Sequence, residues 1–555
     1  MKQLPVCIQD FKEVRKDDCY YVDKSMLIGQ MLDQYRRGVF LYTRPRRFGK
    51  SMNLSMIDAF FNIKYKGNTW FDDLEISKHP EYSGYRNAFP VVNVDFKGAG
   101  AADMQSYLRS VNNDIIKAFK EHPDILSWNK LTKDEVKLID DLFMKTISPE
   151  DLADSVGILC GILERYYGSK VVVLIDEYDD AVNGIKDVDF RQKIIAFIGT
   201  MFSSAFKGNS SLQFGVVTGI LQITKENIFS KVNNFYVNNV LSERYDEMFG
   251  FTDEEVKKIC TDYGHPEKYD EAKEWYDGYR FGDADIYNPW SILNYISEGF
   301  RAQPYWLHTG KSDIVMDLIS KDDTKLIDNL KILGSGGTIP ENIAAKLTFG
   351  DLNKRSSIYS LMVVTGYLKA VHGDVNYQLS IPNKELFEVF SYAVANDVFS
   401  DGGDDENEGV VAGYLAEFSK ALVSNNTEAM KASLTNIFKG NVSSRVLVSE
   451  NSYQAFIAAM LMCLFGKYDV RADYENGKGY CDIMMIKKSG TGPNVVMELK
   501  KSVDSKHLES DAETALEQIK DRDYAYGLRG YTILYGIAFS HKELFIVSEE
   551  SDYLS

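Results

Sequence analysis

The sequence predicts a multidomain α/β protein, and three observations support this fold class. In the first 240 residues, short apolar runs alternate with long amphipathic stretches, which is typical of a parallel sheet with crossover helices. These runs lie at 39–43, 91–96, 171–176 and 212–218. Helical periodicity then dominates, and after about residue 450 a helix and four short strands indicate a separate small α/β unit.

The length of 555 residues exceeds what a single hydrophobic core usually organises, so several domains are expected. We place a parallel-sheet core at 1–244, a mostly helical lid and middle region at 245–445, and the small α/β unit at 446–555. In the middle region, the aromatic-rich segments "WYDGYRFGDADIYNPW" and "YSLMVVTGYLK" are expected to be turns between helices.

Composition limits the classes of protein to consider. With 45% hydrophobic and 26% charged residues, the chain is typical of soluble proteins, and none of its apolar runs reaches the length that spans a bilayer. The N-terminus turns charged before a signal-peptide core could form, so a cytoplasmic location with no membrane association is expected. A net charge of -18 argues against non-specific nucleic-acid binding over the whole surface but leaves a locally basic cleft open.

Cysteine and histidine patterns give no zinc site. The six cysteines form no CxxC pair, and no histidine pairs with a cysteine or another histidine at ligand spacing. We therefore expect reduced, structural thiols.

The segment "TRPRRFGKSMN" at 43–53 is the first candidate site. Gly49, Lys50 and Ser51 supply the last three positions of the phosphate-loop pattern GxxxxGK[ST], between a predicted strand and a predicted helix. Backbone N–H groups at a helix N-terminus, a lysine and a metal-binding hydroxyl suit a triphosphate with Mg²⁺. Arg44 stands where the first glycine belongs, so the loop must turn differently. The tripeptide alone is common in proteins. Its position between a predicted strand and a predicted helix strengthens the prediction of a phosphate loop.

The segment "VVVLIDEYDD" is the second element of this site. A fully apolar run ends in Asp176 and Glu177, as expected for a buried parallel strand with acids at its carboxyl end. There Asp176 could hold Mg²⁺ together with Ser51, while Glu177 polarises the attacking water. The alternative is a buried strand that ends in an exposed acidic turn. Together the two segments predict an ATP site in a P-loop NTPase sheet.

Four further residues have candidate roles at the nucleotide. Thr218 ends another predicted strand and could sense the γ-phosphate, or be a routine strand-terminal threonine. Arg46 and Arg47 could contact phosphates or a neighbouring subunit's nucleotide, or be solvated loop charges. Phe48 is part of the same predicted nucleotide-binding loop. A neighbour's arginine would require a homo-oligomer, and no residue identifies itself as that arginine.

The tail contains a second constellation. Asp482 opens one predicted strand, and Glu498 and Lys500 lie two apart on the next, so they share a strand face and can converge with Asp482 across the hairpin. Val495, Met497 and Leu499 then point into a core. Two carboxylates can bind Mg²⁺, and the lysine can position or help deprotonate an attacking water. This is the spacing of a PD-(D/E)XK nuclease site.

Several segments occur in one order along the chain: "RPRRFGKS", "VVVLIDEYDD", "WYDGYRF", "YNPWSIL", "YWLHTG", "VVTGYL" and "IPNKE". Together they resemble the bacterial AAA-ATPase-like family that carries a C-terminal PD-(D/E)XK nuclease-like domain, from about residue 4 to the end. The resemblance implies a P-loop ATPase core, a helical lid and a small restriction-endonuclease-like α/β tail. It also implies that the arginine-rich loop is a family trait, and that Lys50, Ser51, Asp176 and Glu177 have the nucleotide role by position.

The resemblance extends to residues outside these sites. Gln518 and Tyr524 resemble the helix that follows the nuclease motif, where Gln518 could orient the phosphodiester or the water, or be a surface glutamine. Asn288 and Pro289 resemble the point where the lids of signal-transduction ATPases approach the nucleotide, or they pack the lid on the core.

The first acid that such nucleases often carry on the preceding helix is ambiguous. Glu450 lies slightly early, Gln454 stands in its place, and Glu475 is another possibility, or a turn residue. Two hypotheses follow. One is an ATPase that controls a metal-dependent nuclease acting on DNA or RNA. The other is a nucleotide-operated switch or scaffold whose tail binds a partner or nucleic acid without cleaving it.

Overall fold

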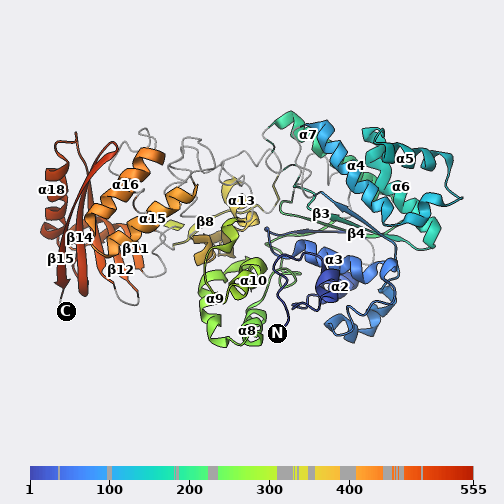
Figure 1. Ribbon diagram of the computed structural model, residues 1–555, viewed down its shortest axis with the longest axis horizontal. Helices are drawn as coiled ribbons and strands as arrows, with labels where there is room; N and C mark the ends of the chain where they lie inside the picture. The colour runs from blue at the N-terminus through green and yellow to red at the C-terminus, as the bar shows by residue number, and fades with distance from the viewer. Residues whose placement is uncertain are drawn as a thin grey trace. The chain divides into compact units, whose positions relative to one another are not determined.

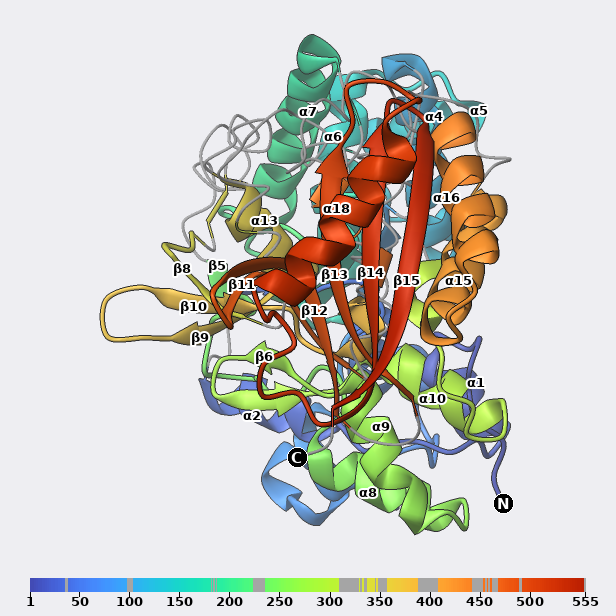
Figure 2. The same ribbon diagram turned by 90° about the vertical axis from the view of Figure 1, so that its left-hand side faces the viewer.

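A computed structural model describes most of the chain as two compact units, drawn from two sides in Figures 1 and 2. One unit comprises Met1–Val315 and Glu341–Tyr377, and the other comprises Met316–Pro340 and Gln378–Ser555. The residues described are 1–34, 38–96, 103–180, 187–222, 235–308, 337–344, 357–387, 408–441, 468–488 and 492–553, with positions 182, 185, 329, 332, 333, 346, 347, 453, 454, 457, 460 and 461.

The first unit is built on a five-stranded sheet in the order β2-β3-β4-β1-β5, in which every pair of neighbours is parallel. The carboxyl ends of all five strands therefore lie at the same edge of this sheet. The four predicted strands are confirmed, and a fifth was missed because it is short and mostly half-buried. The strands are β1 (Val39–Thr43), β2 (Val91–Asp95), β3 (Val171–Asp176), β4 (Leu212–Gly219) and β5 (Phe235–Asn238).

Helices cover both faces of this sheet. In Figure 1, α4, α6 and α7 lie on one face, and α2 and α3 lie on the other. Capping residues set the ends of the helices. In α6, for example, Ser148 is the N-cap, Pro149 is the first residue, and Gly168 follows the helix in the left-handed conformation. The helices are α1 (Phe11–Lys16), α2 (Met26–Gln34), α3 (Lys50–Phe61), α4 (Met104–Lys120), η4 (Pro123–Ser127), α5 (Lys133–Met144), α6 (Pro149–Tyr167) and α7 (Val188–Phe206).

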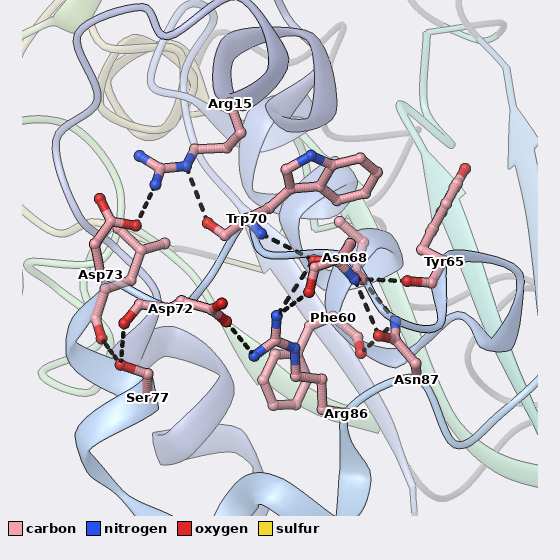
Figure 3. A network of polar contacts seen from close by, with 12 residues as sticks. Arg15, Phe60, Tyr65, Asn68, Trp70, Asp72, Asp73, Ser77, Arg86 and Asn87 are labelled. Carbon is pink, nitrogen blue, oxygen red and sulfur yellow. Dashed lines mark hydrogen bonds and ion pairs between the residues drawn. The ribbon is translucent and has the colours of Figure 1, made fainter.

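A polar network fixes the far end of α3 (Figure 3). Arg15 pairs with Asp73, and Arg86 pairs with Asp72, which ties α1 and the chain after α3 together. The Asn87 amide donates to two carbonyls in the last turn of α3, where no intrahelical partner exists. Helix α3, which begins at Lys50 of the predicted phosphate-binding segment, is therefore anchored at its C-terminal end. The short helices of this segment are η1 (Ile63–Tyr65), η2 (Glu75–Lys78) and η3 (Pro80–Tyr85).

The following region contains more strand than predicted. The expected turn "WYDGYRFGDADIYNPW" includes an antiparallel hairpin of β6 (Tyr279–Phe281) and β7 (Ala284–Ile286), too short for its alternation to stand out. The expected turn "YSLMVVTGYLK" contains α13 (Ile358–Thr365), whose nearly all-apolar sequence hides helical periodicity. The other elements are α8 (Asp253–Asp262), η5 (Pro266–Lys268), α9 (Tyr269–Tyr276), α10 (Pro289–Ser297), η6 (Tyr305–His308), β8 (Ile339–Glu341), β9 (Lys369–His372) and β10 (Tyr377–Ser380).

The C-terminal sheet has the order β11-β12-β13-β14-β15, with β13 and β14 parallel and the other neighbours antiparallel. Helix α18 crosses one face, and α15 and α16 lie on the other (Figures 1 and 2). Strand β11 was not predicted, and the helix expected near 452–466 lies largely outside the described residues. The elements are α15 (Glu408–Val423), α16 (Thr427–Asn441), β11 (Tyr468–Asn476), β12 (Gly479–Lys487), β13 (Asn494–Lys501), α18 (Leu508–Asp521), β14 (Gly530–Ser540) and β15 (Glu543–Tyr553).

The described cysteines are all free thiols, and all but Cys7 are buried. Within the described ranges, no helix is both long enough and apolar enough to cross a membrane.

Candidate functional site

Residues 44–49, which we call the phosphate loop after their predicted role, connect β1 to α3. Gly49 precedes the helix with a φ of 81°, in the left-handed region that glycine adopts without a steric penalty. The buried Lys50 Nζ donates to the main-chain oxygens of Arg44 at 3.1 Å and Pro45 at 3.0 Å. The ammonium group therefore closes the loop from inside, and it does so through main-chain atoms that any residue could supply.

The Arg44 side chain turns away from this loop, which explains how the chain manages without the first glycine. Its fully buried guanidinium donates to the main-chain oxygen of Asn238 at 3.2 Å and to Asn238 Oδ1 at 2.6 Å. It also lies 5.0 Å from the ring centres of Phe249 and Phe281. Burial lowers the pKa of Arg44 to about 9. A large side chain is tolerated here because residues outside the loop enclose it and accept its hydrogen bonds.

Three predicted residues meet at the carboxyl edge of the sheet. Ser51 Oγ donates to Asp176 Oδ2 at 2.6 Å, and Thr218 Oγ1 donates to Asp176 Oδ1. The main-chain N–H of Glu177 also donates to Asp176 Oδ1, at 3.1 Å. Because β4 lies between β1 and β3, Thr218 is next to both the loop and the acid. The structure thus brings Ser51, Asp176 and Thr218 into one hydrogen-bonded group.

Glu177 lies near the cations of the loop. Burial lowers the pKa of Lys50, and the charge of Glu177 is the strongest opposing influence, followed by that of Asp176. Burial also lowers the pKa of Arg47, again opposed by Glu177, while Arg46 lowers the pKa of both cations. The negative charge of Glu177 therefore favours the charged forms of Arg47 and Lys50, while Arg46 opposes them.

Two predicted loop residues direct their side chains elsewhere. The Arg47 guanidinium lies 4.3 Å from the ring centre of Trp290 in α10. Phe48 is fully buried, with its ring centre 4.9 Å from those of Tyr279 and Phe281. Only the main chain of Phe48 is therefore available to a nucleotide.

Asp179 is a site residue that sequence reasoning missed. It is buried and accepts hydrogen bonds from the main-chain N–H of Ile220 at 3.1 Å and of Leu221 at 2.8 Å. Burial raises the pKa of Asp179. These bonds fix the chain that follows Thr218 and so hold its hydroxyl in place. The signal was present, since Asp179 is the third acid of "DEYDD", but nothing in that pattern separates a buried acid from an exposed one.

The residues of this first site fit a magnesium nucleotide. The ammonium of Lys50 and the N-terminus of α3 suit phosphate oxygens, and Ser51 and Asp176 offer the oxygen ligands that Mg²⁺ prefers. A Cβ atom built on Gly49 meets no other atom within 4 Å, so there is open space beside the loop.

The second site lies between the C-terminal sheet and α18. Lys500 Nζ is 3.2 Å from Glu498 Oε1, and the Gln518 amide of α18 donates to the same oxygen. Asp482 Oδ2 accepts the main-chain N–H of Leu499 at 2.7 Å, which ties β12 to β13 at the acids. The Gln518 amide also lies 3.3 Å from the hydroxyl of Tyr524. All the predicted residues of this constellation are brought together, and Val495, Met497 and Leu499 face the opposite core as expected.

Glu498 is a buried acid of this site with a raised pKa. It is 3% exposed, and burial together with the charge of Asp482 raises its pKa to about 7. Its second carboxylate oxygen, Oε2, is buried and has no hydrogen-bond partner among the described residues. A buried carboxylate oxygen with no donor is costly unless a cation compensates it. Glu498 and Asp482 therefore fit a divalent cation such as Mg²⁺.

Gln454 lies beside these acids, where a further carboxylate was sought. Its Nε2 donates to the main-chain oxygen of Asp482 at 3.0 Å. Glu475 is exposed on β11, and Glu450 lies outside the described residues. Nowhere in the described portion do three acid, histidine or cysteine side chains gather in a group that could hold a metal.

Comparisons with known proteins match a different family to the segment that contains each candidate site. Residues 5–229 match the family described as "Predicted AAA-ATPase", and residues 448–549 match the "PD-(D/E)XK nuclease superfamily". The chain is also 23% identical over 563 aligned residues, 98% of each sequence, to the "Uncharacterized protein in vnfD 5'region" of Azotobacter chroococcum mcd 1.

Proposed function

We propose that this chain, which joins an AAA-ATPase-like domain at residues 5–229 to a PD-(D/E)XK nuclease superfamily domain at residues 448–549, is an ATP-driven, Mg²⁺-dependent nuclease acting on DNA or RNA. In this proposal, ATP binding and hydrolysis at the first site control cleavage at the second. The supporting observation is that each domain joins predicted site residues from two separate segments, Ser51 with Asp176 in the first and Glu498 with Gln518 in the second. A bacterial origin and a cytoplasmic location are part of the same proposal.

At the first site, each residue has a chemical task. Lys50 and the N-terminal N–H groups of α3 bind the phosphate oxygens, and Ser51 and Asp176 hold Mg²⁺. When bound, Mg²⁺ neutralises charge on the phosphates. Glu177, next in the chain to Asp176, orients the attacking water and accepts its proton. Thr218 keeps Asp176 in place through its hydroxyl.

At the second site, Asp482 and Glu498 would hold Mg²⁺, and the bound ion would supply Lewis-acid polarisation of the phosphodiester. Lys500 positions the attacking water, and Gln518 fixes the Glu498 carboxylate through its hydrogen bond. Glu498 must be ionised to bind the cation, so its raised pKa makes the site sensitive to pH.

The experiment is a Mg²⁺-dependent cleavage assay on single- and double-stranded DNA and RNA, with and without ATP. It compares the parent chain with Asp482→Ala and Glu498→Ala, and uses Glu543→Ala, at an exposed residue of β15, as a control. We expect cleavage by the parent and the control only. Equal residual activity in the parent and both site variants would exclude this nuclease site.

A second candidate function is a nucleotide-operated switch or scaffold whose tail grips nucleic acid or a partner without cutting it. The specific observation in its favour is the neutral Gln454 beside Asp482, which leaves two carboxylates in the described part of the site. ATP-dependent binding of nucleic acid by the parent, with no cleavage at any Mg²⁺ concentration, would select this candidate.

A further inference from the structure

The phosphate loop is attached to the segment 245–297, which we call the lid segment. A glycine-rich loop has no side chains with which to make such attachments. Here Arg44, Arg47 and Phe48 each contact the lid segment, through three different groups of atoms. These contacts lie within one compact unit.

Arg44 is held by neutral groups. Its guanidinium donates to main-chain and amide oxygens, and the charge of Asp246 in the lid segment only partly opposes the lowering of its pKa by burial. The lid segment contributes the rings of Phe249 and Phe281 and, at 3.4 Å, the main-chain oxygen of Tyr245. A buried cation that is bonded to neutral oxygens keeps its position only while these groups surround it.

Arg47 makes the second attachment. Its φ of 71° lies in the left-handed region that non-glycine residues adopt only when the surroundings impose it. Its guanidinium lies over Trp290, whose place is set by the start of α10. Asn288 caps that helix by accepting the N–H of Trp290 at 2.9 Å, and Pro289 is its first residue.

The third attachment uses main-chain atoms. The N–H of Gly250 donates to the main-chain oxygen of Phe48 at 3.2 Å. Gly250 has a φ of 86°, and a Cβ atom there would lie 2.3 Å from Ile286 within the lid segment and 3.1 Å from the ring of Phe48 in the loop. Only glycine permits this close approach of lid segment and loop.

We propose that the lid segment sets the conformation of the phosphate loop, and that Arg44 and Arg47 are the positioning residues that transmit its position. The inference rests on the proposed function, since it concerns the affinity of the same site for ATP. Lid contacts that touch no nucleotide then control ATP affinity. By thermodynamic linkage, bound ATP stabilises the same lid contacts in return.

Two lid tryptophans provide a matched test. Trp290 and Trp275 both pack against the same lid core, but the described contact with Arg47 is made by Trp290. The full-length chain is titrated with the slowly hydrolysed analogue ATPγS and Mg²⁺. Trp290→Leu should weaken binding about 3- to 30-fold, the range of a partly buried cation–π contact. Trp275→Leu should bind within about twofold of the parent, and Trp290→Phe should recover most of the loss.

A double variant separates positioning from direct phosphate contact. If Arg47 acts through the lid segment, Trp290→Leu should add little to the loss already caused by Arg47→Ala. Melting temperatures show whether each variant is folded, and hydrogen exchange shows whether ATPγS protects residues 245–297. Equal affinities of Trp290→Leu and Trp275→Leu, or full additivity with Arg47→Ala, would overturn the inference. A parent chain that binds no ATPγS would instead overturn the proposed function on which it rests.

Discussion

The two candidate sites keep their carboxylates in different states. At the phosphate loop, both oxygens of Asp176 accept hydrogen bonds from the protein, from Ser51, Thr218 and the Glu177 N–H. In the C-terminal domain, Glu498 Oε1 is bonded to Lys500 and Gln518, while Oε2 has no donor within the described residues. Both carboxylate oxygens of Asp176 therefore have hydrogen-bond donors, whereas one carboxylate oxygen of Glu498 has none within the described residues.

This difference predicts different requirements for a metal ion. A cation at the first site must replace protein hydrogen bonds of Asp176, and the phosphates of a nucleotide supply the further ligands that compensate for this loss. A cation at the second site relieves a buried, unpaired oxygen. We therefore expect Mg²⁺ to bind the first site only together with ATP and to bind the second site alone. The following predictions test or sharpen this comparison.

The largest effect is expected from removing a carboxylate of the second site. Asp482→Asn or Glu498→Gln should lower the rate of Mg²⁺-dependent cleavage by about a thousandfold, since a metal ion contributes several kcal/mol to the transition state. Single-turnover cleavage with saturating substrate measures this rate. A rate within about tenfold of the parent in both variants would contradict the assignment.

Removing the ammonium of the first site should be nearly as severe. Lys50→Met loses both its bonds within the loop and its charge toward the phosphates, and ATP affinity should fall by about a hundredfold. Calorimetric titration with Mg²⁺ and ATP measures the affinity, with the exposed Lys64→Met as the control. The second site should still bind metal in Lys50→Met, because Asp482 and Glu498 belong to the other compact unit.

Glu177→Gln should separate binding from hydrolysis. The amide cannot accept a proton from water, so the rate of hydrolysis should fall by about a hundredfold while ATP affinity stays within about threefold. Steady-state phosphate release and nucleotide titration give the two quantities. Hydrolysis at the parent rate would remove Glu177 from this role.

The raised pKa of Glu498 gives a pH dependence of stability in the absence of metal. Between its ordinary pKa of 4.5 and about 7, the folded state binds more protons than the unfolded state, so stability falls as pH rises through this window. The loss is on the order of 1–3 kcal/mol. Thermal unfolding in a chelator from about pH 5 to about pH 8 should show this decrease, and Glu498→Gln should flatten it. The same pH dependence in the parent and in Glu498→Gln would contradict the raised pKa of Glu498.

The smallest expected effect is a gain at the second site. Gln454→Glu places a third carboxylate beside Asp482, and Mg²⁺ affinity should rise by about three- to tenfold. Calorimetry without nucleotide measures it. No change in affinity, in a variant that melts like the parent, would show that residue 454 does not face the metal.

Much of this arrangement could be predicted from the sequence, because the deciding features are local. Asp176 follows a fully apolar strand, and Glu498 and Lys500 alternate with core residues, so both sets are readable from periodicity. The cavity for Arg44 could not be predicted, because its walls are built from Asn238, Phe249 and Phe281, distant residues whose meeting depends on tertiary packing. The stack of Arg47 on Trp290 was missed for the same reason.

Metal binding without nucleotide tests the central difference between the two sites most directly. Mn²⁺ is titrated calorimetrically into the parent chain, Glu498→Gln and Asp176→Asn. We predict that the parent and Asp176→Asn bind the ion with the same affinity, and that Glu498→Gln loses at least about tenfold. Binding that survives in Glu498→Gln but is lost in Asp176→Asn would contradict the account.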